Sequence, residues 1–316
     1  MKFKNLFTAF LVMLLTLIFV MPAAAAIEGD ELPQAHEPLL ITNAGQGPGG
    51  KMGRLLISRS QAVENYDYNL LFSTIKLDAL ESKEIPSIIS QNKVDGLILA
   101  GADINKEMIR AIEELKFPTV LVDNYLRSPI MDSIVSDNFN GAVEAVRYLI
   151  KMGHKKIGYA GGPNSHPSFN ERYKAYKLEL MENNLEINDS FIKIKNDFSQ
   201  EMGKKLAKEF LQEDKLPTAI FAANDAAAFG VLKELKKRGI KIPEKAGVVG
   251  FDNVNFAEYS SPSLTTISRP INKIGKISSQ IILNKLKKKN YKQSKRRDIT
   301  LNVELIKRGS TAERIS

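Results

Sequence analysis

Short apolar runs alternate with longer amphipathic segments along most of the chain. Helical segments such as Asn105–Leu115 and Glu201–Leu211 separate most of these runs. Strands alternating with helices predict an α/β fold with doubly wound parallel sheets, covered by helices on both faces. The runs that we interpret as buried strands are Pro38–Thr42, Tyr68–Ser73, Gly96–Ala100, Thr119–Asp123, Ile157–Ala160, Phe191–Ile194, Thr218–Ala222 and Gly247–Phe251.

The pattern is clearest between residues 217 and 268. A buried run at Thr218–Ala222 is followed by a helix-capping asparagine, Asn224, and by the amphipathic segment Ala226–Arg238. The next run, Gly247–Phe251, also ends in a polar residue, Asp252. A strand–helix–strand unit of this kind is right-handed and parallel. Ligands of parallel sheets bind beyond the carboxyl ends of the strands, where Asn224 and Asp252 are expected.

The first 26 residues have the three parts of a secretory signal peptide. Lys2 and Lys4 form a basic start, and Leu6–Met21 is an apolar run that is short for a membrane span. The small residues that follow predict cleavage near Ala25 or Ala26, and therefore export to the periplasm or beyond. The alternative is a cytoplasmic protein with a buried first helix, although such a helix would show a polar face. Residues 27–37 would form a loose mature N-terminus.

A glycine-rich segment at 43–50 follows the first predicted strand. Gly45 to Lys51 have the spacing of a phosphate-binding loop, but Met52 stands where a Ser or Thr would hold magnesium. We therefore interpret the segment as a turn before a helix at Met52–Tyr66.

Composition excludes several classes of site. The 316 residues include no cysteine, so disulfides, thiol nucleophiles and thiolate metal ligands are absent. The three histidines are dispersed, and we interpret His154, between a helix and a strand, as structural. No paired carboxylates in a motif, catalytic triad or metal-ligand cluster is evident, so we expect no enzyme, no catalytic residue, no metal and no cofactor.

The net charge of +9 raises the question of a polyanionic partner. Much of this charge lies in one basic run between residues 285 and 297, which contains no acidic residue. The simplest interpretation is a solvated helix end and loop. The alternative is a contact with a polyanion or a membrane surface.

Several segments together resemble the effector-binding core of the lactose/galactose repressor (LacI/GalR) family. They include AANDAAAFG at 222–230, GVVGFDNVNFAEYSSPSLTTISRP at 247–270, QNKVDGLILAG at 91–101 and VSDNFNGAVEAVRYLIKMGHKKIGY at 135–159. ITLNVELIKRGS, at 299–310, resembles the closing strand of the family. The resemblance runs from about Tyr66 to Thr311 and implies the periplasmic-binding-protein-like I fold, in which two parallel-sheet lobes are joined by a three-strand hinge. It implies a first lobe of residues 38–153 plus 271–289 and a second of 154–266 plus 297–316.

The resemblance also implies a ligand site. Arg172, Phe198, Asn224 and Asp252 match positions at which the family has an arginine, an aromatic ring and two polar residues. Such groups suit a sugar, because arginine, asparagine and aspartate hydrogen-bond hydroxyls and a ring packs on the apolar face of a pyranose. Each residue alone could instead be a surface charge, a core ring, a cap or a turn residue. The candidates at the rim of the site are Asp137, Asn138, Asn140, Asn43 and Gln46.

The leading hypothesis is an exported, non-enzymatic receptor that closes two lobes on a small molecule, such as a sugar or polyol. One alternative is a LacI/GalR-type transcriptional regulator core, and another is a fusion of an exported N-terminus to such a core near Tyr66. Residues 1–65 do not resemble a helix-turn-helix, so DNA is not an expected partner. A homodimer and a membrane transporter or sensor partner both remain open.

Overall fold

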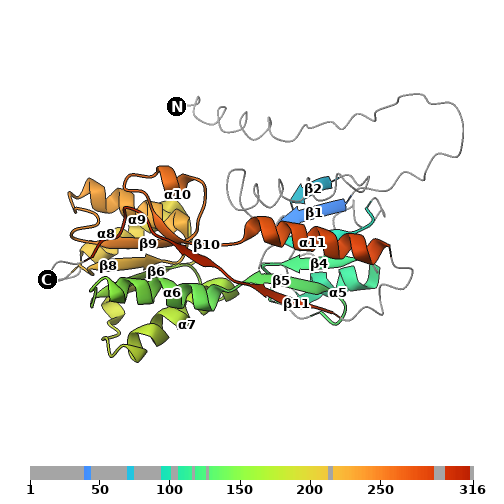
Figure 1. Cartoon of the computed structure of the whole chain (residues 1–316), viewed down its shortest axis with the longest axis horizontal. Helices are drawn as coiled ribbons and strands as arrows, with labels where there is room; N and C mark the ends of the chain where they lie inside the picture. The colour runs from blue at the N-terminus through green and yellow to red at the C-terminus, as the bar shows by residue number, and fades with distance from the viewer. Residues whose placement is uncertain are drawn as a thin grey trace, which may run out of the picture. The chain divides into compact units, whose positions relative to one another are not determined.

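The computed structural model describes residues 39–43, 70–74, 94–100, 106–115, 118–125, 128–212, 216–287 and 296–313. The predicted signal peptide, the terminus at 27–37, the turn that contains Gln46, and the helix at Met52–Tyr66 lie outside these residues. The described part of the chain forms two six-stranded sheets, each in its own lobe (Figure 1).

The first sheet has the strand order β11-β5-β4-β3-β1-β2, with all described pairings parallel. Its helices α5 and α11 are Lys106–Leu115 and Ile271–Leu286. α11 packs on β3, β4 and β5 over a core that includes Ile98, Ile134 and Ile274. The strands are β1 (Leu39–Asn43), β2 (Leu70–Thr74), β3 (Leu97–Ala100), β4 (Thr119–Val122), β5 (Asp132–Ser136) and β11 (Asp298–Leu301).

The second sheet has the order β12-β10-β9-β8-β6-β7 and is parallel except for β12. Its strands are β6 (Ile157–Gly161), β7 (Ile192–Ile194), β8 (Ala219–Ala222), β9 (Gly247–Asp252), β10 (Thr265–Ser268) and β12 (Glu304–Ile306). Its helices are α6 (Asn138–Lys151), α7 (Pro167–Glu182), α8 (Gln200–Leu211), α9 (Asp225–Lys237) and α10 (Phe256–Tyr259), with a short 3-10 turn at Asp189–Phe191.

Strand β8 shows why this sheet needs helices on both faces. Ala219 and Phe221 belong to the core beneath α6 and α7, whereas Ile220 and Ala222 belong to the core beneath α8 and α9. Successive side chains of a strand point to opposite faces, so an unbroken apolar run is buried on both sides. The predicted fold class, two parallel-sheet α/β lobes, is confirmed.

The chain crosses between the lobes at three places, but the lobe boundaries differ from the prediction. α6 packs on α7 and on strands of the second sheet, so the first crossing follows Ser136 and not residue 153. β11 pairs with β5 of the first sheet, so the last crossing lies at Asn302 and Val303 and not before residue 297. The single closing strand expected at Ile299–Ser310 is therefore two strands, β11 and β12, one in each sheet (Figure 1).

Two strands were missing from the prediction because polar residues interrupt them. In β5 only Ile134 and Val135 are apolar. The buried polar residues of this strand have internal partners: Asp132 pairs with Lys285 at 2.8 Å, and the Ser133 hydroxyl donates to the Asn124 carbonyl at 3.0 Å. The other missing strand, β10, reads Thr-Thr-Ile-Ser. Satisfied polar groups can be buried in a strand, and periodicity alone does not reveal them.

The segment before Tyr66 contributes to the first sheet. β1 lies between β2 and β3 and pairs in parallel with both. A strand that precedes the predicted change in resemblance is thus an integral part of the sheet built by the residues that follow.

The basic run is not wholly a solvated helix end. Lys285 is buried, and its ammonium lies 2.8 Å from the Asp132 carboxylate. Arg297 pairs with the same carboxylate at 3.1 Å, and Arg296 pairs with Asp298. Lys285 and Arg297 thus tie α11 and the start of β11 to Asp132 of β5. Lys287 is exposed, and residues 288–295 lie outside the described residues.

Candidate ligand-binding site

Arg172 lies at the centre of the polar groups that the sequence singled out. It stands on the buried side of α7 with 2% of its surface exposed. Its Nε donates to Asn138 Oδ1 at 2.9 Å, and its other nitrogens donate to the same oxygen and to the Ala223 carbonyl. The guanidinium is therefore fixed between α6, α7 and the end of β8.

Two residues at the end of β9 complete the surroundings of this guanidinium. The Phe251 ring centroid lies 3.6 Å from Arg172 Cζ, and Asp252 Oδ1 lies 3.8 Å from an Arg172 nitrogen. Burial lowers the pKa of Arg172, and Asp252 opposes this shift. Arginine keeps its proton despite such a shift, because its ordinary pKa is far above neutral.

The backbone at Asp252 adopts an uncommon conformation. Its φ angle is +128° and that of Asn253 is +53°. A φ of +128° is strained for a residue other than glycine, whereas +53° is a left-handed conformation that asparagine adopts readily, and strained residues cluster at active and ligand-binding sites. The strain is held in place by Asn253, whose side chain donates to Ser268 at 3.1 Å and accepts from Arg308 at 2.9 Å.

The structure brings Phe198 and Asn224 together. Asn224 caps α9, because its Oδ1 accepts from the Ala227 amide at 2.9 Å, and its Nδ2 donates to the Phe198 carbonyl at 3.0 Å. The half-buried Phe198 ring packs on Phe169 with a centroid distance of 5.1 Å. Asn224 thus acts as a helix cap and also positions the loop that carries the aromatic ring.

The structure describes some of the predicted rim residues and leaves one outside the described residues. Asp137 is the cap of α6 and accepts from the Asn140 backbone amide at 3.0 Å and from its side chain at 2.7 Å. Asn43 is the last residue of β1, in register with Ala100 of β3. Gln46 lies outside the described residues. His154 is buried with Nδ1 3.1 Å from the Thr218 hydroxyl, which agrees with a structural role.

Four further residues gather where the lobes meet, and the sequence analysis did not select them. Arg269 forms an ion pair with Asp123, and its Nε donates to the Ser136 hydroxyl at 2.9 Å. The Tyr125 hydroxyl donates to Glu171 at 2.9 Å. Asp123 and Tyr125 follow β4 of the first sheet, whereas Glu171 stands on α7 of the second lobe. A polar residue or tyrosine shortly after a buried strand was the signal that could have found Asp123 and Tyr125.

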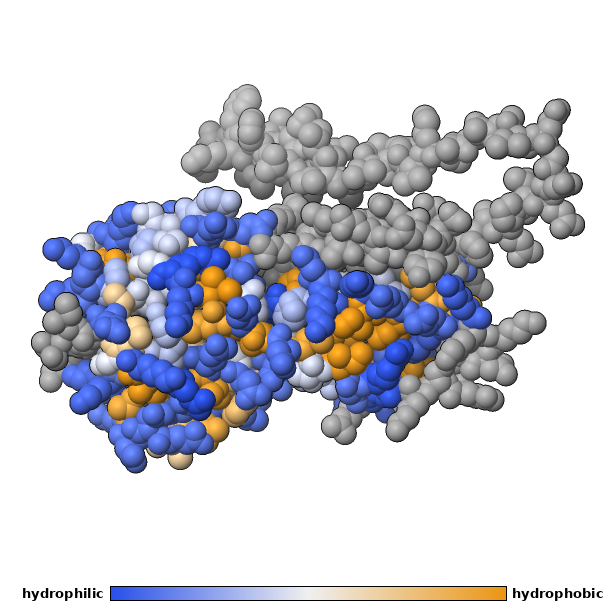
Figure 2. All heavy atoms as spheres, viewed as in Figure 1, coloured by the Kyte–Doolittle hydropathy of each residue, from blue (hydrophilic) through white to orange (hydrophobic). Residues whose placement is uncertain are grey.

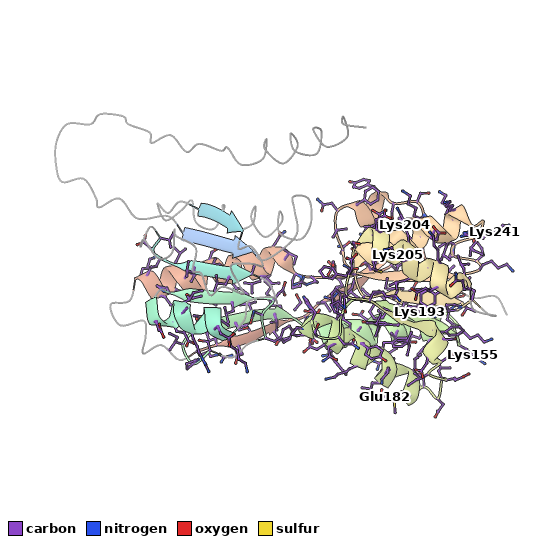
Figure 3. All side chains as sticks on the ribbon, turned by 180° about the vertical axis from the view of Figure 1, so that it is seen from behind. Lys155, Glu182, Lys193, Lys204, Lys205 and Lys241 are labelled. Atoms are coloured by element: carbon purple, nitrogen blue, oxygen red, sulfur yellow. The ribbon has the colours of Figure 1, made fainter. Side chains whose placement is uncertain are left out.

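The charge of the chain is distributed unevenly. On the face seen in Figure 2, hydrophilic residues cover most of the described part of the chain, with smaller hydrophobic areas between them. Lys155, Lys193, Lys204, Lys205 and Lys241 lie on the second lobe, away from the junction of the lobes (Figure 3). The described residues at the junction include two arginines and the carboxylates of Asp123, Glu171 and Asp252. The positive net charge therefore does not indicate an anionic ligand at this place.

The described residues offer neither a membrane span nor a metal site. None of their helices is long and apolar enough to cross a membrane. No group of three or more histidine, aspartate or glutamate side chains is arranged to hold a metal ion in the part of the chain that the structure describes.

Comparison with known proteins supplies the family. A family model described as "Periplasmic binding protein-like domain" matches residues 146–311. The HTH-type transcriptional repressor PurR of Aliivibrio salmonicida is 30% identical over 253 residues, which cover 78% of this chain and 75% of that protein. The HTH-type transcriptional repressor CytR of Escherichia coli K12 is 29% identical over 249 residues, covering 78% of this chain and 71% of that protein.

Solved structures share the fold. A LacI family transcriptional regulator from Enterococcus faecium with bound ribose has a TM-score of 0.76 at 22% identity, and covers 87% of this chain and 99% of its own. The complex of the transcriptional regulator CelR with cellobiose has a TM-score of 0.76 at 19% identity. The match covers 87% of this chain and 86% of the CelR chain. The chain belongs to the periplasmic binding protein-like family, and it is an effector-binding domain of the LacI/GalR type.

Proposed function

We propose that this domain binds a small, uncharged, hydroxyl-rich molecule, such as a sugar or polyol, between its two lobes. The observation that carries the proposal is the fixed guanidinium of Arg172, which is buried beside Asp252 at the carboxyl end of β9. Ligands of open parallel sheets bind at these strand ends. Bound ribose and cellobiose in two regulators of the same fold support a sugar. Like its repressor relatives, the domain is a binding protein and not an enzyme.

The geometry matches such a ligand in two ways. Arginine and carboxylate groups offer charge-assisted hydrogen bonds to hydroxyls, which are stronger than bonds between neutral groups. The half-buried Phe198 ring, held by Asn224, offers an apolar surface for the C–H face of a sugar. The three crossings between the lobes would allow them to close on the ligand.

The relatives favour a regulatory role over that of a free receptor, because the repressors align with about three quarters of both chains. In this role, the ligand changes the arrangement of the lobes and thereby the activity of a transcription regulator. Binding of an operator-like DNA duplex by the full chain, altered by the sugar, would support it. No measurable binding of DNA with or without the sugar would count against it.

A second candidate, an exported receptor, is favoured by the basic start and apolar run of residues 1–26. The test is a fusion of residues 1–37 to alkaline phosphatase, which is active only outside the cytoplasm. An active fusion that loses its leader supports export. An inactive fusion of full length contradicts it.

A thermal-shift screen tests the binding function itself. The chain would be melted with D-ribose, D-galactose, cellobiose, glycerol and adenosine, each at high concentration. A ligand that binds only the folded state at about 100 times its Kd adds about 2.7 kcal/mol of stability. We expect at least one sugar to raise the melting temperature by about 5 °C or more. An unchanged melting temperature with every compound would contradict the proposal.

A further inference from the structure

The Tyr125 hydroxyl is enclosed by polar groups of the other lobe. It donates to Glu171 Oε2 at 2.9 Å and accepts a hydrogen bond from Asn138 Nδ2. The buried Ser168 side chain also favours the ionised phenol and lowers the pKa of Tyr125, against the larger effects of burial and Glu171. Tyr125 follows β4 of the first lobe, whereas Asn138 begins α6 and the other two stand on the first turns of α7. One hydroxyl from the first lobe therefore occupies a polar position built by the second.

This position has the donors and acceptors that a hydroxyl requires. A hydroxyl has one proton to donate and two lone pairs to accept with, and the carboxylate of Glu171 can only accept when ionised. Burial and the negative charge of Glu171 raise the pKa of Tyr125 to about 12, so the phenol keeps its proton at neutral pH. Asn138 and Ser168 are buried, so their side chains are held in place.

The same position adjoins the proposed ligand site. Asn138 accepts from Nε of Arg172 at 2.9 Å through Oδ1, while its Nδ2 donates to Tyr125 and to the Ser136 carbonyl. One asparagine side chain thus joins the site arginine to the tyrosine hydroxyl. A ligand hydroxyl in place of the phenol would be linked to Arg172 through the side chain of Asn138, by one hydrogen bond on each side.

We propose that Asn138, Ser168 and Glu171 form a subsite for one hydroxyl of the ligand, and that Tyr125 fills this subsite in the ligand-free protein. The inference rests on the proposed function. The subsite accepts a neutral hydroxyl and disfavours a phosphate or carboxylate, because an anion would face Glu171 at close range. The phenol also bridges the lobes, so it stabilises a ligand-free arrangement that competes with the ligand-bound one.

The first test is Tyr125→Phe, which removes the hydroxyl and keeps the ring. The probes are D-ribose and cellobiose, titrated into the full chain by calorimetry. Removing a competing hydrogen bond to a carboxylate should tighten the better probe about tenfold. Tyr148→Phe is the matched control. Tyr148 stands near the C-terminal end of α6, far along the helix from Asn138, and its hydroxyl lies 3.0 Å from the Thr311 hydroxyl. A Kd within twofold of the wild type for Tyr125→Phe overturns the proposal.

A second variant separates the subsite from the bridge. Adding Glu171→Ala to Tyr125→Phe removes an acceptor that the ligand would use, so the Kd should rise about tenfold above that of Tyr125→Phe alone. An unchanged Kd would show that Glu171 does not bind the ligand. If the proposed function itself is wrong, the result differs from this one: neither sugar binds the wild type or any variant. That outcome contradicts the subsite as well.

The bridge can be measured without a ligand. The chain has no cysteine, so Glu107→Cys on α5 and Lys241→Cys after α9 would give one spin label on each lobe. Both positions are exposed. Tyr125→Phe should shift the distribution of label distances towards longer values, whereas Tyr148→Phe should not. An identical distribution in Tyr125→Phe and the wild type contradicts the bridge.

Discussion

Arg269 and Asp123 form an ion pair between the two lobes. Arg269 directly follows β10 of the second sheet, and Asp123 directly follows β4 of the first. Arg269 is buried and also donates to Ser136, the last residue of β5, at 2.9 Å. One guanidinium thus ties together two of the three segments that cross between the lobes and fixes the junction where we place the ligand.

Asp123→Asn should lower the stability of the protein. The change leaves the buried charge of Arg269 with a weaker partner, and breaking a buried pair costs about 3–5 kcal/mol. Asp123 is partly exposed, with 29% of its side-chain surface accessible, so we expect about 2 kcal/mol. Urea unfolding measures the change. Glu201→Gln is the control, because its pair with Lys204 is on the surface and should leave the stability almost unchanged.

Asp132 should make the stability depend on pH in the acid range. Burial alone would raise the pKa of Asp132, but hydrogen bonds from Lys285 and Arg297 lower it below its ordinary value. Because the folded pKa lies below the unfolded value of about 3.9, the stabilisation is complete above that pH and is lost as the pH falls through the folded pKa. We expect Asp132→Asn to cost about 3 kcal/mol at neutral pH and to flatten the acid limb of the stability curve.

The measurement is urea unfolding at a series of pH values from neutral down to about 2. The matched control is Asp298→Asn, whose side chain is 60% exposed and pairs with Arg296 on the surface. A wild-type curve parallel to that of Asp132→Asn below about pH 4 would show that the buried pair does not contribute.

Arg172 and Asp252 should be coupled in stability. Arg172 has 2% of its surface exposed and Asp252 4%, so removing either one takes a close counter-charge away from a buried ionised group, although Asp252 keeps its electrostatic interaction with Arg269. We expect Arg172→Met to cost about 3–5 kcal/mol and Asp252→Asn less, since asparagine keeps the shape of the side chain and its capacity for hydrogen bonds. The double variant should cost at least about 1 kcal/mol less than the sum of the single variants. Additive costs in a double-mutant cycle would contradict a direct interaction.

The crossing of α8 and α9 should not accept a larger residue than glycine. A Cβ atom on Gly203 would lie 2.1 Å from the Ala227 carbonyl oxygen, and one on Gly230 would lie 2.1 Å from that of Gln200. Backbone atoms cannot move aside as a side chain can, so Gly203→Ala should cost about 2–3 kcal/mol. Thermal unfolding measures this cost. An unchanged melting temperature would mean that α8 and α9 can move apart without loss of stability.

The strands that the sequence predicted are those with unbroken apolar runs, such as β8 and β9. The strands that it missed, β5 and β10, contain buried serine, threonine or aspartate residues whose partners come from distant segments. The lobe assignment of α6 was wrong for a related reason. The apolar face of Val146 and Leu149 predicts a helix, but periodicity does not say which of two sheets the face will cover.

The site residues also divide into those that the sequence predicted and those that it did not. Arg172, Phe198, Asn224 and Asp252 follow from the family resemblance, and the structure places them around the ends of β8 and β9. The sequence does not show what Tyr125 and Arg269 pair with, because Glu171 and Asp123 are on the opposite lobe from them and more than 40 positions away. The pairing depends on how the three crossings bring the lobes together.

The most direct test of the central claim is a calorimetric titration of the sugar that stabilises the protein most into the wild type and into Asp252→Asn. If the sugar binds beside Arg172 and Asp252, loss of the charge-assisted hydrogen bond should weaken binding by about 10-fold to 100-fold, with the folded protein otherwise intact. Phe198→Ala should weaken it as well. Equal affinity in all three proteins would contradict the account and place the ligand elsewhere.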